Sequence, residues 1–291
     1  HFGSSLLGKG TSSNFPRHCM PMEYVTLPGT DLRVSRICLG TMSFVGAGGM
    51  DSLPEEESIR VIHKALDSGV NFIDTAEAYV DNAAERVVGK ALQSWNGGSR
   101  EQVVIASKFG KHQGEESIRY TAQMIEKSLA TSLEAFQTPY LDLYQVHWAA
   151  NMADVEETVA CLEGLKAKGL IRHYGVSNFG PKSLAAFLEA GGKPATNQLP
   201  YNLLWRAIEF EIVPLCVQHN IGILTHSSLQ QGLLTGSYSS PEQVPEGRRR
   251  TRHFPGDSTT LSRHGGKGCE ALTFDTLQAL RETCTQHDEV A

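Results

Sequence analysis

Four ionisable side chains stand at or just beyond the ends of three apolar runs that have the length of β-strands. Asp74 ends the run VNFID and Tyr79 follows five residues later, Lys108 follows VVIAS, and His147 follows LDLYQV. An acid, a phenol, an amine and an imidazole at the carboxyl ends of successive strands are typical of the active site of a parallel α/β barrel. Because an ammonium stabilises a phenolate, we expect Lys108 to lower the pKa of Tyr79 from about 10 and to make it a proton donor at neutral pH.

The elements that must position these side chains are visible as an alternation of strand-like and helical patterns over 36–226. The strand-like runs lie at 36–40, 70–74, 103–107, 141–146, 173–177, 195–199 and 221–226. Apolar residues between them recur at helical spacing, and Gly69, Gly169 and Gly222 are expected to stop three of the helices. This alternation predicts a parallel sheet, and no Pro/Gly/Ser-rich linker divides it, so we expect a single domain over 23–291.

Two segments lie outside this alternation. Residues 24–34 hold two short alternating runs around the turn PGTD, which predicts a hairpin suited to cap the amino-terminal mouth of a barrel. Residues 237–268 are polar and turn-rich, and residues 270–289 have the pattern of an amphipathic helix. Seven strands are found and an eighth is not. We therefore expect a TIM (β/α)8 barrel whose last strand is missing from this chain, which would then be a fragment with two unpaired sheet edges.

Composition limits the classes of function. The chain has 291 residues, with 26 basic and 32 acidic side chains and a net charge of −6, which argues against nucleic acid as a partner. It contains no apolar run long enough to span a membrane and no cluster with metal-ligand spacing. Its six cysteines are scattered, as in a reducing compartment. We expect a cytoplasmic protein, while the Ser-rich, acid-free residues 1–22 are either a disordered transit peptide, which would mean a plastid, or an artefact.

Seven segments of the chain resemble, in order, the aldo-keto reductase family. They are RICLGTMSF, GVNFIDTAEAY, IASKFG, LDLYQVHW, GVSNFG, NQLPYNLLWR and GLLTG. The resemblance begins at about Glu23 and covers nearly the whole chain. It implies a barrel that binds NADPH, or less often NADH, across its carboxyl-terminal mouth and reduces aldehydes or ketones to alcohols. The physiological substrate, beyond a small carbonyl compound, and the oligomeric state are left open.

The resemblance also implies roles for the four side chains. Tyr79 is the proton donor, Lys108 and Asp74 tune it, and His147 orients the carbonyl group. Chemistry asks for the same parts, because hydride delivered to a carbonyl carbon leaves charge on the oxygen, where donors must already be aimed.

A larger set is implied to bind the cofactor. It consists of Thr41, Met42, Ser177, Asn178, Gln198, His226, Ser227, Leu229, Gln231, Gly232 and Arg252. The chain departs from the family at His226, where a Tyr or Trp usually stacks on the nicotinamide, and at Ser237, where a basic residue often follows GLLTG and for which Arg252 or a neighbour could substitute. The segment that carries the contacts to the 2′-phosphate is not found, so the expectation of NADPH rests on family habit.

Each of the four side chains also has a structural interpretation. Asp74 could cap a helix, Lys108 could be a solvated strand end, His147 a core histidine and Tyr79 a rim aromatic. Their occurrence together at three neighbouring strand ends favours function. For residues 248–252, by contrast, a mobile solvated loop is favoured over phosphate binding.

Three other functions remain as alternatives to an NADP-dependent oxidoreductase. One is a non-enzymatic redox-sensing subunit, since SNFG and GLLTG are close to the pattern of the β subunits of voltage-gated potassium channels. Another is an aldolase-type barrel with Lys108 as a Schiff base. The third is an inactive, truncated homologue.

Overall fold

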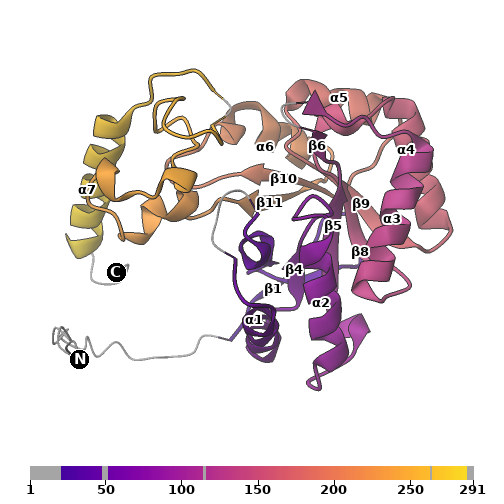
Figure 1. The fold of residues 1–291 in the computed structure, drawn as a ribbon. Helices are drawn as coiled ribbons and strands as arrows, with labels where there is room; N and C mark the ends of the chain where they lie inside the picture. The colour runs from indigo at the N-terminus through magenta and orange to yellow at the C-terminus, as the bar shows by residue number, and fades with distance from the viewer. Residues whose placement is uncertain (1–20, 48–51, 114–115, 263, 287–291) are drawn as a thin grey trace.

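The computed structural model describes residues 21–47, 52–113, 116–262 and 264–286, drawn as a coloured ribbon in Figure 1. Seven parallel strands form one curled sheet in the order β11-β10-β9-β8-β5-β4-β3. They are β3 (Leu39–Gly40), β4 (Phe72–Asp74), β5 (Val104–Phe109), β8 (Leu141–Val146), β9 (Ile171–Ser177), β10 (Thr196–Pro200) and β11 (Gly222–His226). Every expected strand is confirmed, and within the described residues no eighth strand joins β3 to β11. Residues 1–20 of the expected leader lie outside the described part of the chain.

Helices connect successive strands of the sheet. They are α1 (Glu55–Asp67), α2 (Ala83–Ser94), α3 (Ala122–Phe136), α4 (Val155–Ala167), α5 (Pro181–Glu189) and α6 (Ile208–Gln218), with α7 (Glu270–Gln286) after the last strand. Short 3₁₀ turns are η1 (Met42–Val45), η2 (Arg100–Gln102), η3 (Ala149–Asn151), η4 (Gln230–Thr235), η5 (Pro241–Gln243) and η6 (Glu246–Arg248), and a small hairpin pairs β6 (His112–Gln113) with β7 (Glu116–Ser117). The side chains of Thr121 and Asp154 cap α3 and α4 by accepting backbone N–H bonds.

Glycine ends two of the helices as expected, and the third expectation is wrong. Gly69 and Gly169 follow α1 and α4 with φ of 91° and 72°, a left-handed conformation that costs glycine little. After α6, however, the left-handed residue is Asn220, with φ of 54°, and Gly222 is the first residue of β11. Asparagine tolerates this conformation better than most side chains, so the turn does not need a glycine.

The main core lies between the sheet and the helices. Side chains that alternate along the strands are fully or almost fully buried against helical residues of the same character. The strand members include Ile73, Ile105, Phe109, Tyr144, Tyr174 and Val176, and the helical members include Ile62, Val88, Leu129, Leu162 and Leu184. Burying a side chain of this size contributes about 1.5–3 kcal/mol, which explains why parallel strands read as apolar runs in the sequence.

The predicted hairpin is confirmed and covers the amino-terminal ends of the strands. β1 (Tyr24–Thr26) and β2 (Arg33–Ser35) pair antiparallel. Three of the hairpin's apolar side chains form a second core with residues that begin the strands. This core contains Leu27, Leu32 and Val34 together with Phe72, Val104, Leu143 and Ala195. The hairpin therefore closes the mouth opposite the one at which the four ionisable side chains were expected.

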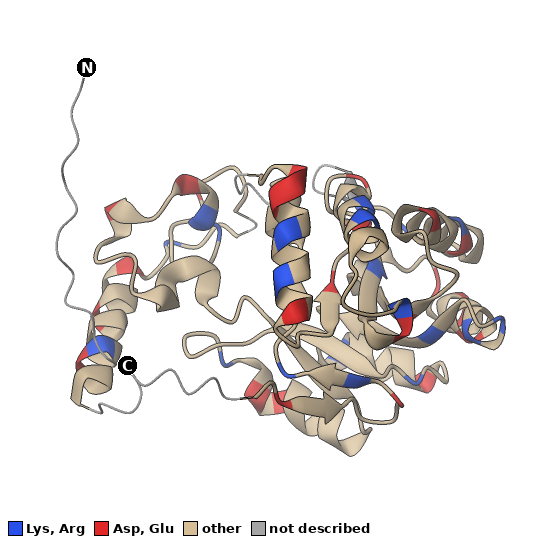
Figure 2. Cartoon of the chain, turned by 90° about the horizontal axis from the view of Figure 1, so that it is seen from below, with Lys and Arg blue, Asp and Glu red and all other residues tan. Residues whose placement is uncertain are grey.

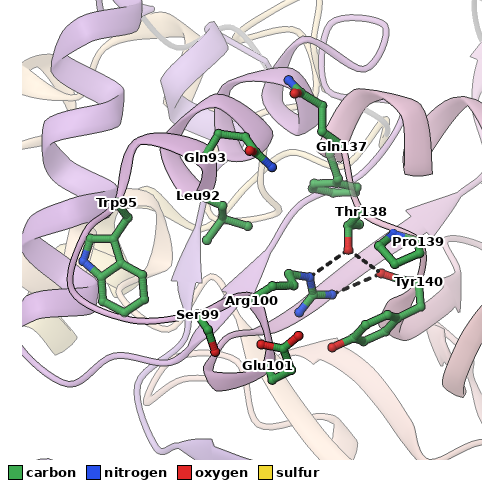
Figure 3. Close-up of a pocket in the computed structure, with 11 residues that line it drawn as sticks. Leu92, Gln93, Trp95, Ser99, Arg100, Glu101, Gln137, Thr138, Pro139 and Tyr140 are labelled. Atoms are coloured by element: carbon green, nitrogen blue, oxygen red, sulfur yellow. Dashed lines mark hydrogen bonds between the residues drawn. The ribbon is translucent and has the colours of Figure 1, made fainter.

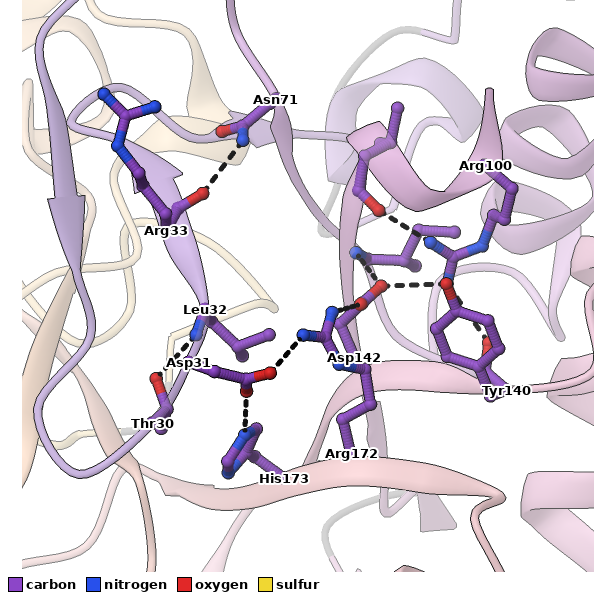
Figure 4. Close-up of polar contacts among 12 residues, drawn as sticks. Thr30, Asp31, Leu32, Arg33, Asn71, Arg100, Tyr140, Asp142, Arg172 and His173 are labelled. Atoms are coloured by element: carbon purple, nitrogen blue, oxygen red, sulfur yellow. Dashed lines mark hydrogen bonds and ion pairs between the residues drawn. The ribbon is translucent and has the colours of Figure 1, made fainter. Parts of the chain in front are cut away.

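Ion pairs hold the hairpin to the strands beneath it, as Figure 4 shows. Asp31, at the turn, accepts hydrogen bonds from Arg172 (2.7 Å) and His173 (2.8 Å). Arg172 also donates to Asp142 (2.6 Å), which accepts a further bond from Arg100 (2.8 Å). The hydrogen bonds from His173 and Arg172 lower the pKa of Asp31 to about 2. The turn is thus linked to the first residues of β9.

The polar segment after β11 contains a small core, although Arg248 and Arg252, within the stretch expected as a solvated loop, are exposed. Residues 237–262 and 264–286 lie beside the β11 edge, coloured orange to yellow in Figure 1, and end in α7, which confirms the predicted helix. Leu233, Val244, Phe254 and Leu277 form a small core here, with Phe254 fully buried. The sequence did not predict this core, because its members are spread over more than forty positions and stand among polar residues.

Charges of both signs are interspersed along the helices in the view of Figure 2. Among the described residues, no helix is both long enough and apolar enough to cross a lipid bilayer.

Candidate active site

A buried ion pair forms the centre of the site. Lys108, at the carboxyl end of β5, is fully buried, and its Nζ donates to both carboxylate oxygens of Asp74 (2.7 and 2.9 Å) and to the carbonyl of Thr75 (2.7 Å). Gln198, from β10, donates to Asp74 Oδ1 (2.8 Å). Lys108 is therefore not a solvated strand end. Asp74 does not cap α2 either, because Asn82 occupies that position.

Tyr79 and His147 lie against this pair. Lys108 Nζ is 5.5 Å from the centre of the Tyr79 ring. The rings of Tyr79 and His147 are 6.1 Å apart and nearly perpendicular, at 78°. His147 is buried and stacks on Trp148, with ring centres 3.5 Å apart. The structure thus brings together all four side chains at the ends of β4, β5 and β8, as the sequence predicted.

The electrostatics differ in one respect from the expectation. Burial raises the pKa of Tyr79 above its ordinary value of 10.0; the ammonium of Lys108 opposes this rise without reversing it, and the charge of Asp74 adds to it. The prediction of a lowered pKa for Tyr79 was therefore wrong for the net shift. For Lys108, burial lowers the pKa, but the charge and hydrogen bond of Asp74, together with the charges of Tyr79 and Cys38, outweigh it and the pKa is raised. At neutral pH the phenol is protonated and the amine is charged.

Hydroxyl, amide and imidazole groups at the ends of β9, β10 and β11 form a hydrogen-bonded row beside Asp74. Ser177 Oγ donates to the carbonyl of Gln198 (3.1 Å), and Asn178 Nδ2 donates to the carbonyl of His147 (3.1 Å). His226 Nε2 lies 3.2 Å from Asn178 Oδ1. Burial, with the charge of Lys108, lowers the pKa of His226 to about 4, so the imidazole is neutral at physiological pH. A carboxamide needs neutral donors and acceptors of this kind, so the row fits the nicotinamide end of the expected cofactor.

The loop after β11 is a compact turn whose residues lie in the left-handed region. Ser227, Gln230 and Gln231 have positive φ of 54°, 46° and 54°, and Gly232 follows with φ of 99°, where any side chain would be strained. The N–H groups of Gln230 and Gly232 donate to the carbonyls of Ser227 (2.8 Å) and Leu229 (3.0 Å), which fixes the turn. The positive charge that a pyrophosphate needs would come from arginines beside the loop.

Arginines from the C-terminal segment contact this loop. Arg248 Nη1 donates to the carbonyl of Gln231 (3.3 Å), and Arg250 Nε donates to its side-chain oxygen (3.1 Å). Arg252, the predicted phosphate partner, is exposed, and its carbonyl accepts a bond from Cys269 Sγ (3.7 Å). The basic run was visible in the sequence, but which of its members approach the loop depends on the fold of the segment.

The remaining expected cofactor residues lie around the same mouth. Thr41 is fully buried and donates from Oγ1 to the carbonyl of Asp74 (3.2 Å), and Met42 begins η1. Leu229 precedes η4 and is more than half exposed. Glu77, two residues before Tyr79, was not singled out from the sequence, although a carboxylate inside the apolar stretch TAEA was a signal.

The hollow shown in Figure 3 is a separate feature. It measures about 180 Å³ and lies between the ends of α2 and α3 and the segments that lead into β5 and β8, which is the amino-terminal side of the sheet. Arg100 extends into it, but its guanidinium donates to Thr138 Oγ1 (3.0 Å), to the carbonyls of Val103 (2.6 Å) and Tyr140 (3.1 Å), and to Asp142. Its charge thus serves the structure.

Comparison with known proteins agrees with this geometry. The family model "Aldo/keto reductase family" matches residues 36–290. Aldo-keto reductase YhdN of Bacillus subtilis is 38% identical over 239 residues, which are 80% of this chain and 70% of that protein. The NADH-specific methylglyoxal reductase of Escherichia coli is 32% identical over 247 residues, or 79% and 74% of the two chains.

A solved structure matches as well. The glycerol dehydrogenase AKR11B4 from Gluconobacter oxydans superposes with a TM-score of 0.73 at 29% identity, covering 90% of this chain and 78% of that one. The curled seven-stranded sheet and its hairpin correspond to the barrel of such enzymes. The chain belongs to the aldo-keto reductase family.

Proposed function

We propose that this chain is an NAD(P)H-dependent reductase that converts a small aldehyde or ketone into an alcohol, with Tyr79 as the proton donor. The observation that carries the proposal is the ion pair of the fully buried Lys108 with Asp74, which lies against the Tyr79 ring, with the His147 ring 6.1 Å from that of Tyr79. A protonated phenol next to a fixed cation is suited to give up a proton and to be stabilised afterwards as a phenolate.

The residues of the chain would share the work as follows. A bound nicotinamide cofactor supplies the hydride. Ser177, Asn178 and Gln198 would hold its carboxamide, and the neutral imidazole of His226 would offer an aromatic surface beside it. Donors aimed at the carbonyl oxygen stabilise the charge that develops there.

Tyr79 transfers its hydroxyl proton to that oxygen, and His147 orients the carbonyl by a second contact. Lys108 stabilises the resulting phenolate until solvent returns a proton, and Asp74 keeps the ammonium in place.

We propose NADPH as the preferred cofactor, with NADH as the alternative. Arg248 and Arg250 support NADPH, because both contact Gln231 in the loop that the family resemblance assigns to the pyrophosphate, where their charge suits a further phosphate. The name of the Escherichia coli relative, which is NADH-specific, supports the alternative. Fluorescence titration of both cofactors against the wild type and Arg248→Ala separates them. A loss of affinity confined to NADPH supports the proposal, and tighter binding of NADH contradicts it.

Steady-state turnover tests the reductase against the other functions. We expect NADPH oxidation that depends on a small aldehyde, with methylglyoxal as the first probe because the Escherichia coli relative is named for it. Cofactor binding without turnover across a panel of aldehydes and ketones would favour a redox-sensing subunit, and no cofactor binding would favour an inactive homologue. A Schiff-base mechanism is disfavoured by the charged state of Lys108, and the absence of borohydride trapping would exclude it.

A further inference from the structure

The buried carboxylate of Glu77 lies close to the site and is not used by the proposed chemistry. Glu77 is 4% exposed, and its side chain accepts three hydrogen bonds: from the backbone N–H of Gly110 (2.8 Å), from the Tyr120 hydroxyl (2.6 Å) and from Ser128 Oγ (2.6 Å). A buried carboxylate with this many donors is fixed in one orientation. The position of the Glu77 side chain is therefore fixed by its hydrogen bonds.

Glu77 belongs to the loop that carries Tyr79. The N–H of Glu77 donates to the carbonyl of Lys108 (3.2 Å), and its carbonyl accepts from Asn82 (2.9 Å). In the same loop, directly after Tyr79, Val80, Asp81 and Asn82 all have positive φ, of 49°, 51° and 62°. A β-branched residue such as Val80 is rarely found in this conformation, which persists only where surrounding contacts enforce it.

The contacts of Glu77 also reach the residues on the other side of the site. Gly110, which its carboxylate holds, has φ of 128°, and a Cβ there would lie 2.3 Å from Asn151 Oδ1 and 3.0 Å from His147 Cβ. The carbonyl of Phe109, the preceding residue, accepts the N–H of His147 (2.9 Å). Glu77 thus joins the Tyr79 loop to the strand end between Lys108 and His147.

We infer that Glu77 is a positioning residue, whose buried carboxylate fixes Tyr79 relative to Lys108. This inference rests on the proposed reductase function. The pKa of Tyr79 responds to burial, to the charges of Lys108, Asp74 and Arg250, and to a side-chain hydrogen bond with Lys108, so it depends on where the phenol lies relative to Lys108. Glu77 acts by holding the loop, and so sets the position of the Tyr79 phenol relative to Lys108.

Two substitutions separate position from charge. Glu77→Ala removes all three bonds, whereas Glu77→Gln keeps an oxygen for Gly110 and Tyr120 and turns an amide toward Ser128, whose hydroxyl can accept as well as donate. A displacement of about 1 Å at a reacting group can cost roughly 100-fold in rate. We expect Glu77→Ala to lower kcat by about 10- to 100-fold with KM and cofactor affinity within about threefold, and Glu77→Gln to keep most of the wild-type kcat.

A matched control addresses stability. Asp142 is equally buried and accepts from Arg100, from Arg172 and from the N–H of Ile105, but it lies at the opposite end of the sheet. Asp142→Ala should destabilise the fold, as Glu77→Ala does, while kcat of the folded protein stays close to wild type. In Glu77→Ala the upper limb of the pH–kcat profile should also move to higher pH, because a phenol displaced from Lys108 loses the influence that lowers its pKa.

Failure of the Glu77 inference and failure of the proposed reductase function give different results. Wild-type kcat and an unshifted profile in Glu77→Ala would overturn this inference, and so would a Glu77→Gln as impaired as Glu77→Ala, which would assign the effect to charge. An absence of turnover in the wild type would instead contradict the proposed function. If Glu77→Ala does not fold, Tyr120→Phe removes one of the three donors, and it should lower kcat by a few fold at unchanged KM; an unchanged kcat there would also overturn the inference.

Discussion

Lys108 and Asp74 form a bidentate ion pair in which the ammonium is fully buried and the carboxylate side chain is 14% exposed. The partners come from the ends of adjacent strands, since Asp74 pairs with Ala106 in the register of β4 and β5. Removing one partner of such a pair leaves a buried charge without compensation. The pair is therefore both a structural feature and the part of the site most sensitive to substitution.

Asp74→Ala should lower the free energy of unfolding by about 3–5 kcal/mol, because the buried Lys108 ammonium would lose both carboxylate acceptors and its counter-charge. Urea titration measures this change. The exposed pair of Lys90 and Glu55 gives the control, since Glu55→Gln should change stability by less than about 1 kcal/mol. Equal effects in the two variants would show that the buried pair has no special weight.

The rate of reduction should be insensitive to pH across the neutral range. The reaction needs protonated Tyr79, and because burial raises the pKa of Tyr79 above 10.0, the phenol keeps its proton throughout that range. We expect kcat to fall only above about pH 10. A pH–rate profile with a descending limb centred between about pH 7 and 8 would contradict the assignment of Tyr79 as the donor.

His226→Trp should tighten cofactor binding. An indole offers more surface to a stacked nicotinamide than an imidazole does, and aromatic stacking contributes about 0.5–1.5 kcal/mol beyond buried area, which corresponds to roughly a 2- to 10-fold lower Kd. Fluorescence titration of NADPH is the measurement, with His226→Ala as the control that should weaken binding. In the wild type, Kd should show no step between about pH 5 and 8 that depends on His226, because its pKa is about 4.

Asp31→Asn should loosen the hairpin in a pH-dependent way. The folded-state pKa of Asp31, about 2, lies below its ordinary value of 3.8, so its contribution to stability is present above pH 3.8 and is lost as the pH falls toward 2. Because the side chain is 68% exposed, we expect at most about 1 kcal/mol at neutral pH. Urea titrations of wild type and variant should therefore converge at low pH. Glu23→Gln, at the start of the same hairpin, is the control. If the stabilities of the wild type and Asp31→Asn diverge as the pH falls, the linkage is contradicted.

Local patterns predicted most of the fold. The strands were visible because both faces of a parallel strand are buried, which leaves apolar runs such as that ending at Asp74, and the turn at Gly29 marked the hairpin. Errors arose where distant residues decide. Phe254 is buried in one small core with Leu277, although the segment before α7 is polar and turn-rich in sequence, and the net pKa of Tyr79 depends on burial that no spacing reveals.

The candidate site shows the same division. The four ionisable side chains were predicted because each ends or follows an apolar run. Glu77 was not, since its three donors come from residues 33, 43 and 51 positions away. Arg250 reaches the loop at Gln231 only through the fold of the C-terminal segment.

The most direct test of the central claim compares wild type with Tyr79→Phe in NADPH-dependent reduction of methylglyoxal, with cofactor affinity measured in parallel. The substitution removes one hydroxyl and keeps the ring that lies 5.5 Å from Lys108 Nζ and 6.1 Å from the His147 ring. The account predicts that kcat falls by at least about 100-fold, in keeping with the loss of a general acid, while Kd for NADPH changes by less than about threefold. A Tyr79→Phe variant that reduces the aldehyde at the wild-type rate would contradict it.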